Sequence, residues 1–146
     1  VARIAGLFTR RGFNLNSFTG EQTEDPRVSR ITIWANQDED EIYQIKKQVE
    51  KLVDIKKVIE LDPKQSVVKE LALIKINLNA ETSEKAMYWV EEFSARLVDI
   101  DTEIMTFQIC NNKEKIDQFI EAVRPYGIIE SVRTGVVALA RGNAHI

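Results

Sequence analysis

The chain has 146 residues, of which 44% are hydrophobic and 29% are charged, a balance that suits one compact domain or two small ones. Lys and Arg total 20 against 23 Asp and Glu, a net charge of −3, so the positive excess that a phosphate backbone attracts is missing. No apolar run approaches the roughly 18 to 20 residues that cross a bilayer. Neither a nucleic-acid partner nor a membrane partner is expected.

The residues that most often carry metal or nucleophilic chemistry are scarce. Cys110 is the only cysteine and His145 the only histidine, so an internal disulfide and a structural zinc site cannot form. A Ser-His-Asp or Cys-His arrangement is scarcely available, because His145 lies in a polar tail. We therefore expect no catalytic residue and no metal in this chain, and a reducing, cytoplasmic setting.

The first residues of the chain have the apolar spacing of a helix. Apolar residues at i, i+3, i+4 and i+7 predict a helix that is already under way at Val1. Two arginines, Arg10 and Arg11, suit the negative end of its dipole, and Gly12 ends it. Because the pattern begins in mid-course, we expect a further segment upstream of Val1.

The rest of the first half predicts a hairpin, a helix and a strand. A turn at Asp25 and Pro26 separates two alternating runs, and an acidic stretch before the helix suits its N-terminus. The predicted elements are strands over 13–21 and 28–35, a helix with an apolar stripe over 42–53, and a strand over 57–61. Residues 62–66 then predict a linker.

The second half predicts strand, helix, strand, strand, helix and strand. Its elements are a strand over 67–78, a helix whose stripe is Ala86, Val90, Phe93 and Leu97, strands over 98–101 and 103–110, a helix capped by Asn111, and a strand over 128–139. The first half has the same order without its opening strand. We predict an α+β fold of two tandem ferredoxin-like βαββαβ units, spanning 1–62 and 67–142.

Most polar clusters have an ordinary structural explanation. The acidic run from Asp38 to Glu41 fits a helix start better than a divalent metal site. Asp99, Asp101 and Glu103 fit a solvated strand edge. Neither a phosphate-cradling glycine loop nor a nucleophile elbow occurs, which argues against catalysis by this chain alone.

The segment from Arg11 to Ser17 carries the most informative polar residues. Asn14 and Asn16 alternate with Phe13 and Leu15 just after the predicted helix end. An amide there can donate to a carboxylate and accept from an ammonium group, which suits a free amino acid. The alternative is that both asparagines only satisfy the backbone of a turn.

Five segments, in order, resemble one family over about residues 1–142. They are RIAGLFTRRGFNLNS, DPRVSRITI, QIKKQVEKLVDIKKV, ELALIKI and RPYGIIESVRTGVVALARG. Together they resemble the small, regulatory subunit of acetolactate synthase, also called acetohydroxyacid synthase. The resemblance implies an N-terminal ACT domain, an amino-acid-sensing βαββαβ module, followed by a second ferredoxin-like domain.

The resemblance also implies a function without chemistry of its own. Such a subunit binds a separate catalytic subunit, which carries thiamine diphosphate, FAD and Mg²⁺, raises its activity, and confers feedback inhibition by valine or related branched-chain amino acids. The effector sits between two ACT domains of a homodimer. In the motif R-G-[FY]-N-[IL], Asn14 matches the effector-binding asparagine and Leu15 the apolar residue after it; the family's first strand and its Asn-x-x-Gly loop would precede Val1.

Two questions stay open at this point. The surface that meets the catalytic subunit is expected to include Arg10, Arg11, Arg27 and Arg30, although solubilising charge explains any one of them equally well. An ACT-type sensor serving another biosynthetic enzyme is the main alternative function. An acylphosphatase-like enzyme shares the fold order but needs a phosphate-binding arginine that residues 79–83 lack.

Overall fold

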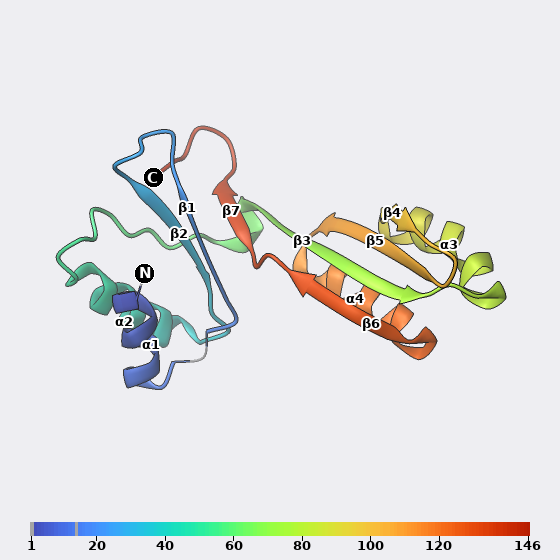
Figure 1. Cartoon of the computed structure of the whole chain (residues 1–146). Helices are drawn as coiled ribbons and strands as arrows, with labels where there is room; N and C mark the ends of the chain where they lie inside the picture. The colour runs from blue at the N-terminus through green and yellow to red at the C-terminus, as the bar shows by residue number, and fades with distance from the viewer. Residues whose placement is uncertain (1, 14) are drawn as a thin grey trace. The chain divides into compact units, whose positions relative to one another are not determined.

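The computed structural model describes residues 2–13 and 15–146 (Figure 1). Within them lie four α-helices and seven strands, with two short 3₁₀ turns, η1 and η2. In chain order these are α1 (Ala2–Arg11), β1 (Ser17–Gln22), β2 (Ser29–Trp34), α2 (Glu39–Glu50), η1 (Pro63–Gln65), β3 (Ser66–Asn77), α3 (Ala80–Phe93), β4 (Arg96–Ile100), β5 (Ile104–Asn111), α4 (Lys113–Val123), η2 (Arg124–Tyr126), β6 (Ile128–Arg133) and β7 (Val137–Ala140).

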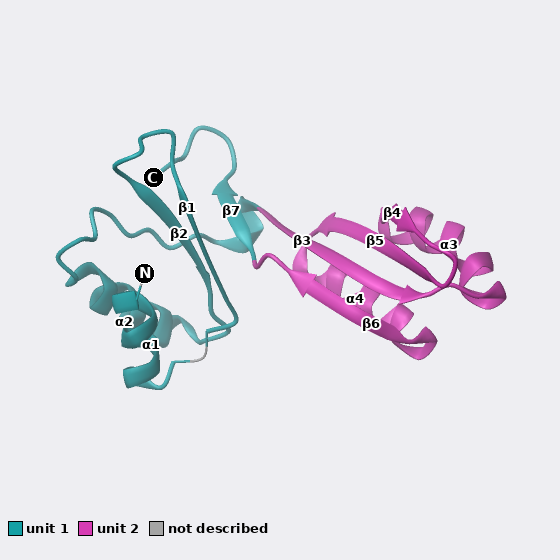
Figure 2. Cartoon of the chain, in the orientation of Figure 1, with its two compact units in different colours: residues 1–67, 136–146 teal, residues 68–135 magenta. Residues whose placement is uncertain are grey.

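The chain divides into two compact units (Figure 2). Unit 1 comprises Val1–Val67 together with Val136–Ile146, and unit 2 comprises Val68–Gly135. The predicted linker is the 3₁₀ turn η1, which Asp62 caps by accepting a hydrogen bond from the backbone N–H of Lys64 at 2.9 Å. Residues 136–142, which the sequence assigns to the second domain, group with unit 1.

Unit 2 has the predicted βαββαβ order. Its strands lie in the order β4-β5-β3-β6, and all neighbours are antiparallel. This is the ferredoxin-like arrangement, in which the first and third strands occupy the centre of the sheet. The α+β fold with tandem ferredoxin-like units is thus confirmed.

The period of two along β3 decides which face of this sheet is buried. Ala72, Ile74 and Ile76 have no exposed surface, and they join Phe107 and Trp89 in the core beneath α3 and α4. The Trp89 and Phe107 rings meet edge to face, with centroids 5.9 Å apart. Each large apolar side chain buried in this way contributes about 1.5–3 kcal/mol.

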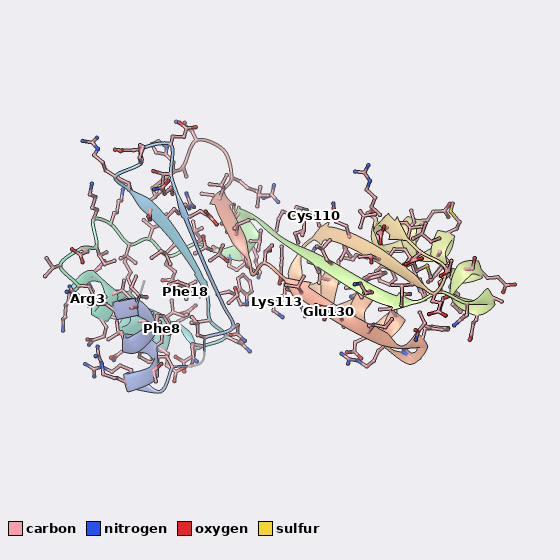
Figure 3. The ribbon with its side chains drawn as sticks, viewed as in Figure 1. Arg3, Phe8, Phe18, Cys110, Lys113 and Glu130 are labelled. Carbon is pink, nitrogen blue, oxygen red and sulfur yellow. The ribbon has the colours of Figure 1, made fainter. Side chains whose placement is uncertain are left out.

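Unit 1 is built on the hairpin of β1 and β2, paired from Ser17 opposite Trp34 to Gln22 opposite Ser29. One face carries Phe18, Ile31 and Ile33, which pack against the helices. From α1 and α2 come the buried side chains Ile4, Leu7, Phe8, Ile45 and Val49; Phe8 and Phe18 are labelled in Figure 3. The predicted hairpin and both predicted helices are present.

The predicted strand over 57–61 is wrong. These residues form no strand, although Val58 and, just before them, Ile55 pack against the core of unit 1. A short run of apolar and β-branched residues indicates burial, whereas a strand also needs a neighbouring backbone to pair with. The described sheet of unit 1 pairs β1 with β2 only.

Three predicted boundaries also need correction. Strand β1 begins at Ser17, not at residue 13, because the backbone N–H of Asn36 donates to the side chain of Asn16 and the ladder ends there. Leu97 lies in β4, because Ser94 adopts the left-handed conformation and ends α3. The cap of α4 is Asn112, whose side chain accepts from the N–H of Lys115 at 2.9 Å.

The predicted last strand is split into β6 and β7. Gly135 has a φ of 88°, a left-handed conformation that breaks regular pairing. Just before it, the Thr134 hydroxyl accepts a hydrogen bond from the N–H of Leu71 and donates to the carbonyl of Gly135. The alternating β-branched pattern gives no sign of this break beyond the glycine itself.

An ionic network ties α4 to the sheet of unit 2. Arg133 of β6 donates two hydrogen bonds to Glu70, at 2.8 and 2.9 Å, and one to Asp117 of α4 at 2.7 Å. Lys113 pairs with the second oxygen of Asp117 at 2.9 Å. The side chain of Glu70 is only 5% exposed, so the two hydrogen bonds from Arg133 replace those that water would make to this carboxylate.

The network shifts two pKa values. Desolvation acts to raise the pKa of Asp117, but the hydrogen bonds from Arg133 and Lys113 together outweigh it, and this pKa lies below its ordinary value. The hydrogen bonds to Glu70 raise the pKa of Arg133, against the opposing effect of burial. Both shifts favour the charged forms in the folded chain.

Replacing Arg133 with Met is expected to lower the free energy of unfolding by about 2–4 kcal/mol, because Glu70 stays buried without its partner. Arg124→Met, which breaks an exposed pair with Glu121, should cost less than about 1 kcal/mol. Chemical denaturation measures both. Equal losses in the two variants would contradict the structural role of the network.

Acid should weaken the folded chain partly through Asp117. Because the pKa of Asp117 is lower in the folded chain, the unfolded chain binds more protons than the folded chain in acid. The free energy of unfolding therefore decreases as the pH is lowered. This contribution is complete above the unfolded value of about 3.9 and is lost as the pH falls through the lower folded value. In denaturation series across this range, Asp117→Asn should flatten the pH dependence and Lys113→Met should flatten it less; an unchanged profile in Asp117→Asn would refute the assignment.

Candidate functional site

The segment that follows α1 is shaped by a glycine. Gly12 has a φ of 68°, which lets the N–H of Phe13 donate to the carbonyl of Phe8 at 3.1 Å and the N–H of Gly12 to Thr9 at 3.3 Å. These bonds satisfy carbonyls that the helix end would leave unpaired. The predicted end of the helix at Gly12 is therefore correct.

The predicted binding segment is anchored on both sides of residue 14. Phe13 meets Phe8 edge to face, with centroids 6.0 Å apart, and Leu15 packs half-buried against the core of unit 1. The side-chain oxygen of Asn16 accepts from the backbone N–H of Asn36 at 2.7 Å. Asn16 thus satisfies the backbone of a turn, which was the alternative we gave for it.

Asn14, the predicted effector-binding residue, lies outside the described residues. Its role stays a prediction. The described neighbours each have a contact of their own: Phe13 with Phe8, Leu15 with the core of unit 1, and Asn16 with the backbone of Asn36.

The four arginines expected at a partner surface have different environments. Arg10 is exposed at the end of α1, and Arg11 donates to the side chain of Gln48 at 3.2 Å. Arg27 is exposed and bound twice to Asp25, at 3.0 and 2.9 Å, and the side-chain bond between them lowers the pKa of Asp25. Arg30 is half-buried and donates to the carbonyl of Ala138 at 2.7 Å.

The contact of Arg30 is part of a feature that sequence reasoning missed. Because Phe18, Ile31 and Ile33 face the helices, Ser17 and Arg30 lie on the opposite face of the hairpin. Ser17 accepts a hydrogen bond from the N–H of Val136 at 3.3 Å, and Val136 is 1% exposed. These contacts join residues more than a hundred positions apart, and no local pattern signals them.

The C-terminal segment is also held to the chain near η1. The N–H of Arg141 donates to the carbonyl of Gln65 at 2.9 Å, and β7 pairs with β3, whose first two residues belong to unit 1. The hairpin of unit 1 is therefore packed on one face by helices and contacted on the other by the end of the chain.

The acidic residues and the possible metal ligands of the described chain have structural roles or lie apart. Among the described residues, no cluster of three or more His, Cys, Asp or Glu side chains could hold a metal ion. The carboxylate of Asp38 caps α2 by accepting from the N–H of Glu41 at 2.8 Å, as the helix-start explanation predicts. No helix within the described part of the chain is long and apolar enough to cross a membrane.

Comparison with protein families finds two models that match in tandem. A model described as an AHAS small subunit-like ACT domain matches residues 1–57, and one described as the small subunit of acetolactate synthase matches residues 69–142. The two matches fall on either side of the η1 turn.

Individual relatives match over nearly the whole chain. A probable acetolactate synthase small subunit of Methanothermobacter thermautotrophicus is 39% identical and covers 98% of this chain and 86% of its own length. The isozyme 3 small subunit of Salmonella typhimurium is 37% identical, covering 98% and 88%. The crystal structure of the small subunit from Thermotoga maritima matches with a TM-score of 0.87 at 36% identity, covering 98% and 89%. The chain belongs to the family of acetolactate synthase small subunits.

Proposed function

We propose that this chain is a regulatory subunit that binds a separate acetolactate synthase catalytic subunit, raises its activity and makes it sensitive to valine or a related branched-chain amino acid. It would thereby act in branched-chain amino-acid biosynthesis, in the cytoplasm. The chemistry is assigned to the catalytic subunit with its thiamine diphosphate, FAD and Mg²⁺, and none of these is assigned to this chain. The membership of both units in the small-subunit family supports the proposal.

The described residues on either side of position 14 support the effector-site proposal. Helix α1 ends at Gly12, two apolar side chains fix the backbone on either side, and Asn16 is already occupied by the backbone of Asn36. We assign Asn14 to the effector because it matches the asparagine of the R-G-[FY]-N-[IL] motif. An amide can bind both the carboxylate and the ammonium group of a free amino acid.

An effector can regulate the enzyme only if its affinity differs between two arrangements of the subunits. We propose a homodimer in which paired ACT domains form the effector sites, so that each site uses residues of both copies. Valine changes the activity of the catalytic partner only if it binds one arrangement of the dimer better than another, a coupling of typically about 1–3 kcal/mol.

The structure refines the choice of partner-contacting residues. Arg30 donates to Ala138 within unit 1, and Arg27 is held by Asp25. Arg10 has no such partner among the described residues and is exposed at the helix end. Of the four predicted arginines, we therefore propose Arg10 as the one that contacts the catalytic subunit.

Asn14→Ala is expected to weaken valine inhibition of the reconstituted enzyme by about tenfold or more, since an amide that binds a charged ligand contributes about 1.5–3 kcal/mol. The measurement is acetolactate formation by the catalytic subunit together with this chain, over a valine titration. Asn143→Ala, in the exposed C-terminal segment, is the matched control. Valine inhibition that is unchanged in Asn14→Ala would refute the role of Asn14.

Arg10→Glu is expected to raise, by roughly tenfold, the concentration of this chain that gives half-maximal activation, because reversed charge at a contact slows association. Arg124→Glu, an exposed arginine of unit 2, should leave that concentration unchanged. The measurement is activity at fixed catalytic subunit while the concentration of this chain varies. An equal effect of both substitutions, or none in Arg10→Glu, would remove Arg10 from the contact.

A further inference from the structure

The sheet of unit 2 has a second face that the helices do not cover. Since Ala72, Ile74 and Ile76 point into the core, the alternate residues of β3 point the other way. The register then places their neighbours on the same open face: Leu71 beside Cys110, Leu73 beside Val132 and Gln108, and Lys75 beside Glu130 and Thr106. Glu130 of β6 and Cys110 of β5 are labelled in Figure 3.

This open face combines an apolar pair with charges of both signs. Val132 is 60% exposed and Leu73 is 37% exposed, and they are direct cross-strand neighbours. Lys75 and Glu130 form the next cross-strand pair on this face, two residues further along each strand. Neither charge forms an ion pair within the described residues.

The outer strand adds one charge of each sign. On β4, Arg96 lies beside Gln108 of β5, and Asp99 lies beside Thr106 of β5. Arg96 and Asp99 therefore share the open face. With Lys69, which occupies an alternate position of β3 like Leu71 and Leu73, the face carries three positive and two negative side chains. A surface with charges of both signs does not suit a strongly acidic or basic partner, whereas it can be complementary to itself.

We propose that this face packs against the same face of a second copy of the chain, about a twofold axis parallel to the strands and midway between β3 and β6. In face-to-face sheet packing, such an axis brings residues of one register row opposite the same row of the second copy. Leu73 then meets the second Val132, and Lys75 meets the second Glu130. Each contact occurs twice, because the arrangement is isologous.

The charges select this axis over its neighbours. An axis along β3 places Lys75 opposite a second Lys75. An axis midway between β3 and β5 places Glu130 of β6 opposite Asp99 of β4. Both alternatives juxtapose like charges, which disfavours them. The axis between β3 and β6 pairs opposite charges and joins the two most apolar positions.

This contact is separate from the effector site and from the paired ACT domains of the proposed function, because all its residues belong to unit 2. Its test must therefore report where two copies touch, and not only that they associate. A dimer held elsewhere in the chain would not bring position 132 of two copies together.

The test uses thiol crosslinking at that position in the whole chain. In a Cys110→Ser background, Val132→Cys places a single thiol beside the proposed axis, and a short bismaleimide should join two copies. Met87→Cys in the same background, on the exposed side of α3, is the control and should crosslink poorly. Equal crosslinking at both positions, or none at position 132, would overturn the proposal.

Charge reversal in the Val132→Cys background gives the sharper test. Lys75→Glu and Glu130→Lys should each reduce crosslinking roughly tenfold, because both contacts then join like charges. Mixing the two variants restores two opposite-charge contacts in the mixed pair, so crosslinking should return between the variants. If each single reversal acts only within its own chain, mixing restores nothing, and that result would refute the interface. Matching circular dichroism spectra of the variants confirm that they fold.

Discussion

Each unit of this chain rests on one constraint, the burial of one face of a sheet beneath two helices. Along β3 the buried residues recur with a period of two, and their loss of contact with water supplies most of the stabilisation of unit 2. In unit 1 the same constraint sets Phe18, Ile31 and Ile33 of the hairpin against α1 and α2. What the chain can bind then depends on the groups that this burial leaves free.

The two units use their remaining surface differently. In unit 1 the hairpin face away from the helices is contacted by the C-terminal segment through Ser17 and Arg30. The candidate effector segment runs from the end of α1 into β1, so it is fixed at Phe13, Leu15 and Asn16. In unit 2 the open face keeps Leu73 and Val132 exposed. Sensing and self-association are thus proposed for different units.

Local patterns predicted the elements well and their long-range contacts poorly. The helix end at Gly12 and the buried face formed by residues 72, 74 and 76 depend on neighbours in sequence. Both predictions were correct. The strand predicted over 57–61 is absent because apolar residues in a short segment indicate burial but not a pairing partner. The hydrogen bond from Arg30 to the carbonyl of Ala138 joins residues 108 positions apart. No local sequence pattern predicts such a contact. The role of Asn14 stays a prediction, as that residue lies outside the described part of the chain.

The most direct measurement of the regulatory role is acetolactate formation by the purified catalytic subunit, assayed with and without this chain over a valine titration. The account predicts that adding the chain raises the rate, that valine lowers it only when the chain is present, and that the chain alone converts no pyruvate. Turnover of pyruvate by the chain alone, or valine inhibition of equal strength in its absence, would contradict the account.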